Sequence, residues 1–417
     1  MTTTTTITAP TQDNGGERRP GPGDRHPAPL RHDDDRFVEL AAEVGAVAAA
    51  HATNHDRDAS FVTEAYAAMR ANGYLRLAVP TELGGLGASI RQVCYAQAEL
   101  ARHDGATALA AAMHLYGTLV QVYRRNHGAP DAEGVLRRIA AEDLIVATSG
   151  GSDWLWPSTV AVVDDEGGGF RVTGRKSFCS QAPEASVIST SAVLCAQGEV
   201  PAPGSEVLHF SVPLAADGVR IEETWDSMGM RGTASHDLVF EEVLVPSERI
   251  VARRPWGEFG PALQVAALHF APVGGATYFG IAAGARDYAV AQATGGSRGV
   301  TPSADLVRIQ RQVGLMDARL RVAWWALMGS IDQLGDDFEA DGETMAMVML
   351  AKREAAIAAG EVVALAMEVV GGRAYLRRCP LERAFRDVRA AVFHPLNPEI
   401  TLTYAGRLAL GGSGAVE

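Results

Sequence analysis

Residues 228–246 read MGMRGTASHDLVFEEVLVP, and this stretch decides how the rest of the sequence is interpreted. Its second half holds two apolar runs, at 238–240 and 243–245, separated by two glutamates. Short β-branched and aromatic runs of this kind are typical of strands. A plain edge hairpin would explain the second half only. It would leave the preceding Met-Gly-Met-Arg-Gly, at 228–232, without a role.

The residues on the N-terminal side of this stretch repeat the strand pattern. Glycine-rich turn signals separate five more short runs rich in β-branched residues. These runs are 159–163, 170–172, 187–193, 207–212 and 219–222. Their number and spacing predict an antiparallel barrel or sandwich and not a parallel sheet.

Helical periodicity surrounds this β region on both sides. Phe37, Leu40, Ala41 and Val44 recur at helical spacing, and 61–69, 90–100 and 106–123 suggest further helices. Beyond 261, the segments 307–334 and 344–370 are long enough to pack as a bundle. We therefore predict a mainly α fold with a central β domain (α+β).

The predicted organisation has four parts. They are a disordered tail at 1–35, an N-terminal helical domain at 36–145, a middle β domain at 146–250 and a C-terminal helical bundle at 251–417. The tail is rich in Thr, Pro, Gly, Arg and Asp and has few large apolar side chains, so it cannot offset its ordering entropy.

Composition excludes several classes of function. The formal net charge of −13 argues against non-specific nucleic-acid binding. No uninterrupted apolar run approaches the roughly 18 residues of a membrane span, and the N-terminus lacks the pattern of a secretory signal. The four cysteines form no CxxC pair, which favours free thiols and a cytoplasmic protein. His51 and His55 have a spacing that can bind a metal, but a solvated helix face is the favoured interpretation and we predict no metal site.

The order of helices, β unit and bundle resembles the acyl-CoA dehydrogenase superfamily. Four segments resemble its motifs, namely 72–87, 146–154, 174–181 and 228–246. The resemblance implies a middle β-barrel, a C-terminal four-helix bundle and a flavin, FAD or FMN, between them. It also implies a homotetramer or homodimer.

The resemblance also implies which residues bind the flavin. In the family, the loop at 146–154 faces the flavin edge, an aromatic at the position of Phe178 lies against the ring, and a hydroxyl at the position of Ser180 reaches its polar edge. The family's interface contacts correspond to positions in the C-terminal bundle. The residues so implied are Thr148, Ser149, Ser152, Phe178, Ser180, Arg298, Gln310, Glu368, Gly371 and Gly372.

The catalytic glutamate of the family's dehydrogenases is missing. At its common position the sequence has His394, and at the alternative position it has Phe270. Glu399 is the nearest acid that could replace it. Histidine at this place suits another branch of the superfamily, whose members add O2 to reduced flavin and oxygenate a substrate through a C4a-hydroperoxyflavin. The sequence Phe-Cys-Ser at 178–180 is also closer to that branch.

We therefore predict a monooxygenase that acts on a small metabolite, with flavin supplied in reduced form by a separate reductase. His394, Ser149 and His114 are the predicted catalytic residues, because they can donate hydrogen bonds to the peroxide or protonate its leaving oxygen. A core position is an equally good interpretation of His114. An acyl-CoA or acyl-carrier-protein dehydrogenase with a non-standard base is the alternative, and a non-catalytic scaffold is a remote one.

Overall fold

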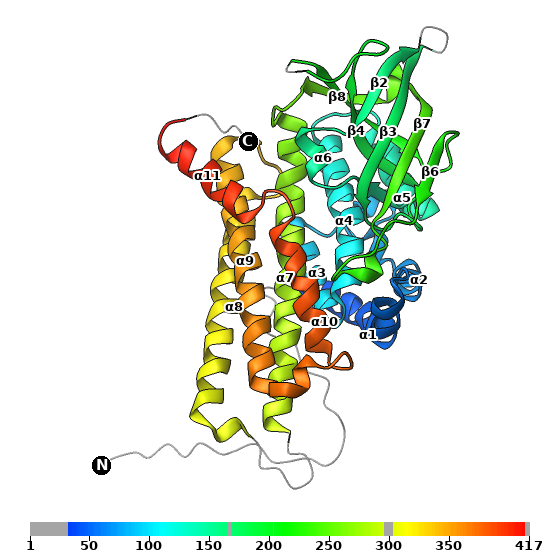
Figure 1. Cartoon of the computed structure of the whole chain (residues 1–417). Coiled ribbons are helices and arrows are strands. Elements are labelled where there is room, and N and C mark those ends of the chain that lie inside the picture. Colours follow the sequence, from blue (N-terminus) through cyan, green and yellow to red (C-terminus); the bar gives the residue numbers. More distant parts are fainter. Residues whose placement is uncertain (1–31, 165–167, 203, 296–302, 413–417) are drawn as a thin grey trace.

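The computed structural model describes residues 32–164, 168–202, 204–295 and 303–412 (Figure 1). Most of the predicted disordered tail, residues 1–31, lies outside the described residues, as does Arg298. The described chain places helices first, a β-sheet second and a helical bundle last, as predicted. In Figure 1 the sheet sits above the first helices and beside the upper half of the bundle.

Between residues 32 and 145 the structure describes five α-helices, besides short 3-10 turns. They are α1 (Asp35–Asp58), α2 (Thr63–Asn72), α3 (Ile90–His103), α4 (Gly105–Asn126) and α5 (Ala132–Glu142). α3 begins at a capping box between Ser89 and Gln92, and Asp104 caps α4 by accepting from the Thr107 amide. α4 is buried over its first fifteen residues, so it is the central helix of this region. α5 was not predicted.

The middle region is one sheet. Its strands are β1 (Val146–Thr148), β2 (Thr159–Asp164), β3 (Gly169–Cys179), β4 (Val187–Leu194), β5 (Glu206–Pro213), β6 (Val219–Glu222), β7 (His236–Pro246) and β8 (Ile250–Pro255), with the short helix α6 (Ser152–Leu155) after β1. The strand order is β6-β7-β3-β2-β4-β5-β8, and β1 pairs with β4. The expectation of an antiparallel arrangement needs correction, because β4 runs parallel to both β1 and β2. The sheet is mixed.

The C-terminal region is built on α7 (Pro261–Thr294), α8 (Val307–Leu334) and α9 (Gly342–Val370), followed by α10 (Pro380–Asp387) and α11 (Pro398–Ala409). α7 packs against both α3 and α9, and it has no polar face. Glycines permit the close contact with α3: a Cβ at Gly280 would lie 2.2 Å from the Ala98 carbonyl oxygen, and one at Gly284 2.4 Å from that of Arg102.

Within the described residues, two helices are long and apolar enough to cross a membrane by length and composition alone. They are α7 and the helix that starts at Gly342. The most apolar 18-residue stretch is 94% buried inside the fold in α7 and 39% buried in the other helix. The burial of α7 identifies it as a core helix of the bundle.

Candidate active site

A group of left-handed backbone conformations marks the end of β3. Phe178, Gln181, Met230 and Ala234 all have positive φ, between 42° and 59°. Each such residue costs on the order of 1 kcal/mol, and this cost tends to be concentrated at functional sites. All four belong to the two segments, 174–181 and 228–246, that the sequence analysis singled out. The left-handed turn leaves the Phe178 ring 57% exposed, with the edge of Trp225 beside it at a centroid distance of 6.0 Å.

The loop after β1 lies between Phe178 and the turn that carries His394. A Cβ at Gly150 would lie 2.8 Å from the Phe178 Cβ, and one at Gly151 would lie 2.5 Å from the Pro395 ring. Only glycine fits at either position. The two glycines therefore bring Ser149, Phe178 and the 394–396 turn together from three distant parts of the chain.

His394 is held from two sides. The Tyr278 hydroxyl lies 2.6 Å from its Nδ1. The Lys352 ammonium donates to the carbonyls of three consecutive residues, 2.7 Å to that of His394, 3.0 Å to that of Pro395 and 2.9 Å to that of Leu396. The Phe270 ring contacts His394 edge-on at 5.6 Å between centroids. The two positions at which the resemblance places a catalytic base are thus neighbours in space, and neither is a carboxylate.

The surroundings of His394 keep its ring neutral. Burial, and then the nearby Lys352 charge, lower its pKa from 6.5 to about 3. Burial also raises the pKa of Tyr278 well above 10, so its hydroxyl keeps its proton. Among the described residues Nδ1 is the one partner of that hydroxyl, which donates to it, and Nε2 then carries the ring proton. Nε2 has no partner in the described part of the chain. His394 is therefore equipped to donate a hydrogen bond, and not to act as an imidazolium acid.

Ser149 belongs to a buried polar network below the sheet. Its hydroxyl donates to an Asp153 carboxylate oxygen at 2.8 Å and lies 3.1 Å from the Thr190 hydroxyl. The same Asp153 oxygen accepts from the Lys176 ammonium at 2.6 Å. Because the Ser149 proton is committed to Asp153, its oxygen is left as a hydrogen-bond acceptor. Thr148 lies beside it at the end of β1, and Ser152 begins α6.

The predicted catalytic role of His114 needs correction. Its ring is fully buried, Nε2 lies 2.6 Å from the Leu75 carbonyl oxygen, and Nδ1 accepts from the Val146 amide at 3.2 Å. Both nitrogens are used to join α4 to β1 and to the turn after α2. Burial lowers the pKa of His114 to about 4, so the ring is neutral. It is a satisfied core histidine, which is the other interpretation that the sequence allowed.

The predicted interface residues lie far from the residues above, along α8 and α9. Gln310 and Glu368 are exposed; Gln310 donates to the Ala304 carbonyl, and Glu368 accepts from Gln312. Gly371 and Gly372 follow α9, with open space where a side chain would project. Within one chain these residues contact nothing at the Phe178 site. The histidines considered for a metal, His51 and His55, both contact Glu64, and no cluster of three metal-binding side chains occurs in the described ranges.

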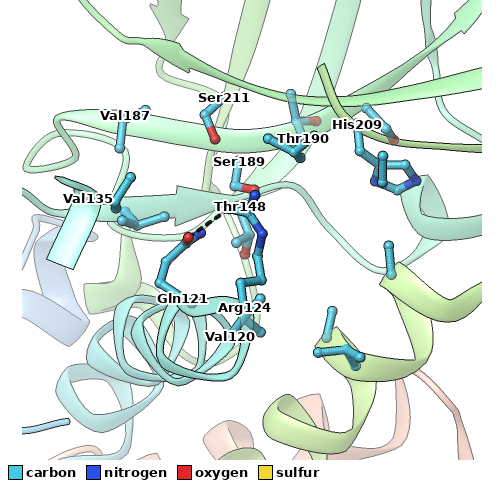
Figure 2. Close-up of a pocket in the computed structure, with 18 of the residues that line it drawn as sticks. Val120, Gln121, Arg124, Val135, Thr148, Val187, Ser189, Thr190, His209 and Ser211 are labelled. Atoms are coloured by element: carbon cyan, nitrogen blue, oxygen red, sulfur yellow. Dashed lines mark hydrogen bonds between the residues drawn. The ribbon is translucent and has the colours of Figure 1, made fainter. Parts of the chain in front are cut away.

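A cavity of about 650 Å³ opens between the sheet and the helices α4, α5 and α7 (Figure 2). Its lining includes Tyr116, Trp154 and seven hydroxyl residues, which are Thr148, Ser149, Ser186, Ser189, Thr190, Ser191 and Ser211. Figure 2 shows Gln121 and Arg124 reaching from α4 toward Thr148 and Ser189. Arg138 and Arg249 complete the cationic part of the lining. Because Tyr116 and Trp154 also contact Phe270, the inner end of the cavity adjoins the His394 cluster.

The residues around Phe178 fit a flavin. An aromatic ring that is 57% exposed and has only one edge contact offers a free face to a planar ring system. The Ser180 hydroxyl two residues later and the His394 Nε2–H provide polar groups of both kinds. Lys352 and Lys176 were not predicted, although the sequence held a signal: they are the only two lysines among 37 basic residues. Both are buried, and both hold a loop of this site.

Buried histidines predict a loss of stability in acid. Burial lowers the pKa of His114, His209 and His269 from 6.5 to about 4, and that of His394 to about 3. Between those values and 6.5 the unfolded chain binds more protons than the folded one, so the free energy of unfolding falls as pH is lowered. Asp387, whose pKa burial raises to about 7, acts in the opposite sense but is a single group.

The measurement is the urea midpoint between pH 7 and pH 4. We expect it to fall steadily over this range. A midpoint that stays constant or rises toward pH 4 would show that these histidines are not buried in neutral form.

The fold and the site together define a flavin-dependent oxidoreductase with a helical domain, a central sheet and a helical bundle. The chain belongs to the acyl-CoA dehydrogenase family, whose N-terminal, middle and C-terminal domain models match residues 34–126, 147–243 and 273–398. It is 32% identical to an L-evernosamine nitrososynthase from a Micromonospora species, with 92% of each chain covered. It is also 32% identical to the putative acyl-CoA dehydrogenase YdbM of Bacillus subtilis, over 87% of this chain and 90% of that protein.

Among solved structures, the chain resembles KijD3 in complex with FMN and dTDP-3-amino-2,3,6-trideoxy-4-keto-3-methyl-D-glucose. The TM-score is 0.79 at 27% identity, and the match covers 92% of this chain and 95% of that one. Relatives thus include nitrososynthases, an indole-3-acetate monooxygenase and a dibenzothiophene monooxygenase, as well as a dehydrogenase by name. The chain is an enzyme of the flavin-dependent oxidoreductase class.

Proposed function

We propose that this protein is a monooxygenase that uses reduced flavin and O2 to oxidise the amine nitrogen of a nucleotide-linked amino sugar. The observation that carries the proposal is the spatial pair of Phe270 and His394. A desaturase needs a carboxylate to remove the proton next to a thioester carbonyl. Phe270 and His394 occupy the two positions at which the family keeps that carboxylate, and they lie side by side here. They present a phenyl ring and a neutral imidazole with a free N–H.

When bound, reduced flavin supplies two electrons, so that one oxygen atom of O2 enters the product and the other is reduced to water. In balanced form, R–NH2 + O2 + FlH2 gives R–NHOH + H2O + Fl. A second turn, R–NHOH + O2 + FlH2, gives R–N=O + 2 H2O + Fl. Phe178 would hold the ring by its face, and Ser180 would lie at its polar edge. The His394 Nε2–H would donate a hydrogen bond to the oxygen that leaves as water.

The cavity supports a nucleotide-sugar substrate. The seven hydroxyls of its wall can pair with a sugar, and the aromatic rings of its inner end can exclude water. The Arg138 guanidinium lies farther out: its side chain is 58% exposed, whereas Thr148 and Ser149 are each only 9% exposed. Guanidinium pairs well with phosphate oxygens. A diphosphate at the outer end would place the sugar toward His394. The names of the nitrososynthase relatives and of the KijD3 ligand agree with this substrate class.

Arg138 and Arg137 form a matched pair for testing the cavity. Both lie on α5, are 58% exposed and pair with a glutamate, but only Arg138 lines the cavity. We expect Arg138→Met to raise KM for a dTDP-amino sugar roughly tenfold, because one phosphate contact is lost. Arg137→Met should leave KM unchanged. Equal values for the two variants would place the diphosphate elsewhere.

The proposed assembly is a homotetramer or homodimer with a separate flavin reductase as partner. The outer side of α8 exposes Leu315 (42%), Val322 (58%) and Trp325 (65%) at helical spacing, an apolar stripe suited to a second copy. Gln310 and Glu368 lie along the same pair of helices, which supports the predicted approach of these residues to a neighbouring subunit's cofactor.

The direct test supplies reduced FMN, O2 and a dTDP-3-amino sugar, and follows the product by mass spectrometry. We expect hydroxylamine and nitroso products with 18O from 18O2. Bleaching of bound oxidised flavin by an acyl thioester without O2, together with no amine oxidation, would instead support the dehydrogenase.

A further inference from the structure

Three buried hydroxyls form a chain that ends at the flavin side of the site. The Ser180 and Ser235 hydroxyl oxygens are 2.8 Å apart, and those of Ser235 and Thr233 are 2.7 Å apart. The Thr233 hydroxyl in turn donates to the Met230 carbonyl at 2.9 Å. Thr233 is fully buried, and Ser235 and Ser180 are 4% and 8% exposed, so bulk water cannot exchange freely with the chain's inner members.

The carbonyl at one end fixes the direction of every proton in the chain. A carbonyl oxygen can only accept, so the single proton of Thr233 points to Met230. Ser235 must then donate to Thr233, and Ser180 must donate to Ser235. The Ser180 oxygen is left with lone pairs and no proton for a ligand. Toward a ligand, the Ser180 hydroxyl can therefore only accept a hydrogen bond.

The surroundings keep this order in place. The Met230 carbonyl also accepts from the Trp225 indole at 3.1 Å, and Trp225 is the residue whose edge contacts Phe178. The Thr233 carbonyl accepts from the Gln181 amide at 2.9 Å, which ties the chain to the turn after Ser180. The hydroxyl chain and the aromatic face are therefore parts of one rigid structure, built from 174–181 and 225–236.

We propose that Thr233 and Ser235 make the site selective for the reduced state of the flavin. N5 of an oxidised flavin has a lone pair and accepts hydrogen bonds, whereas N5 of a reduced flavin carries a hydrogen and donates. A Ser180 oxygen that can only accept would pair with the N5–H of the reduced ring. Beside an oxidised N5 it would place its own lone pair against the lone pair of the nitrogen. The proposal rests on the placement of the flavin's polar edge at Ser180 in the proposed function and takes N5 as the atom of that edge that faces the hydroxyl. It adds two residues that do not touch the flavin.

Such selectivity suits an enzyme that takes its flavin from a separate reductase. The incoming reduced flavin would be held, and the oxidised flavin would leave after each turnover. Thr233 and Ser235 are positioning residues in this account, since they act only through the Ser180 proton.

The test is the dissociation constant of oxidised FMN, measured in air, divided by that of dithionite-reduced FMN, measured under anaerobic conditions. The wild type should bind the reduced form more tightly. In Ser235→Ala the Ser180 proton is freed and can turn to an oxidised N5, so the ratio should fall roughly tenfold. Thr233→Val, which is isosteric, frees the Ser235 proton to point to Ser180 and should give the same change. Ser227→Ala is the matched control, because its hydroxyl donates to the Gly229 carbonyl in the same segment but outside the chain.

The outcomes separate this proposal from the proposed function. If Ser180→Ala weakens the binding of both forms but Ser235→Ala and Thr233→Val keep the wild-type ratio, the proton order is wrong and the flavin placement stands. If Ser180→Ala changes neither constant while amine oxidation persists, the flavin edge lies elsewhere and the selectivity proposal fails with it. The proposal is supported if the ratio of the dissociation constant of oxidised FMN to that of reduced FMN falls in Ser235→Ala and in Thr233→Val but not in Ser227→Ala.

Discussion

Replacement of His394 by alanine should lower the product formed per reduced flavin about a hundredfold, the usual effect of removing a placed donor from a site where negative charge develops. Reduced FMN should still bind and be oxidised, because the Phe178 and Ser180 contacts do not involve His394. The electrons should then appear as H2O2 instead of oxidised amine. The measurement is product by mass spectrometry together with H2O2, both per mole of reduced FMN.

Glu399→Gln provides the control for this experiment. Glu399 is exposed at the start of α11, five residues after His394, and it is the acid that a dehydrogenase account would use in place of the missing glutamate. The variant should keep full product yield. Full yield in His394→Ala, or loss of yield in Glu399→Gln, would contradict the assignment of the site.

The pH profile gives an independent check on His394. Because the pKa of its ring is lowered to about 3, the ring stays neutral over the whole working range of an enzyme. The yield of product per reduced flavin should therefore show no break near pH 6.5. A titration of the yield near 6.5 that disappears in His394→Ala would mean that the imidazolium takes part after all.

Replacement of Lys352 by methionine should have the second large effect, on both coupling and stability. The side chain is 2% exposed and donates to three consecutive carbonyls at 2.7 to 3.0 Å. Its loss leaves the half-buried His394 and Pro395 carbonyls without a partner among the described residues, whereas the Leu396 carbonyl keeps a 3.4 Å hydrogen bond from the Thr401 hydroxyl. Each unpaired acceptor costs about 1–3 kcal/mol, and we expect the free energy of unfolding to fall by about 3 kcal/mol in total because the turn can relax toward water. Product yield should fall as in His394→Ala, since the turn that carries His394 is no longer held.

The comparison of the two variants distinguishes positioning from direct action. Both variants should lower the yield, but His394→Ala leaves one buried donor, the Tyr278 hydroxyl, without its partner, so it should lower the urea midpoint less than Lys352→Met does. Burial lowers the pKa of Lys352 to about 7, and the protein is expected to tolerate its charge because the three carbonyls accept from it. A Lys352→Met protein with wild-type stability and yield would show that the turn is held by other contacts, such as that between Pro395 and Gly151.

The sequence predicted the long elements more accurately than the short ones. α8 begins and ends at the predicted residues, Val307 and Leu334, because its helical periodicity is uninterrupted. β1 has only three residues and was missed, and β8 was missed because its apolar start is followed by Arg253, Arg254 and Pro255, although the four-residue β6 was predicted with its correct bounds. β3 extends seven residues past its predicted end, because the residues that follow Val172 are the polar or small Thr173, Gly174, Arg175, Lys176 and Ser177.

The site could be predicted only in part. The motifs identified Phe178, Ser180 and His394, whose environments the structure supplies. The partners of these residues come from distant parts of the chain: Tyr278 is 116 residues before His394, and Lys352 is 42 residues before it. Nothing local in the sequence links them. His114 shows the reverse error, because the sequence cannot tell whether the backbone groups of β1 and the turn at Leu75 will occupy both ring nitrogens.

In the proposed function the protein activates O2 at reduced flavin and does not remove a proton next to a thioester carbonyl. The most direct test loads the protein with reduced FMN under anaerobic conditions and mixes it rapidly with oxygenated buffer while absorbance is recorded. The account predicts two phases: a species whose spectrum differs from both reduced and oxidised flavin forms first, and oxidised flavin and H2O2 appear only when it decays. Reoxidation in a single phase, with oxidised flavin and H2O2 appearing at once and no intervening species in the wild type, would contradict the account.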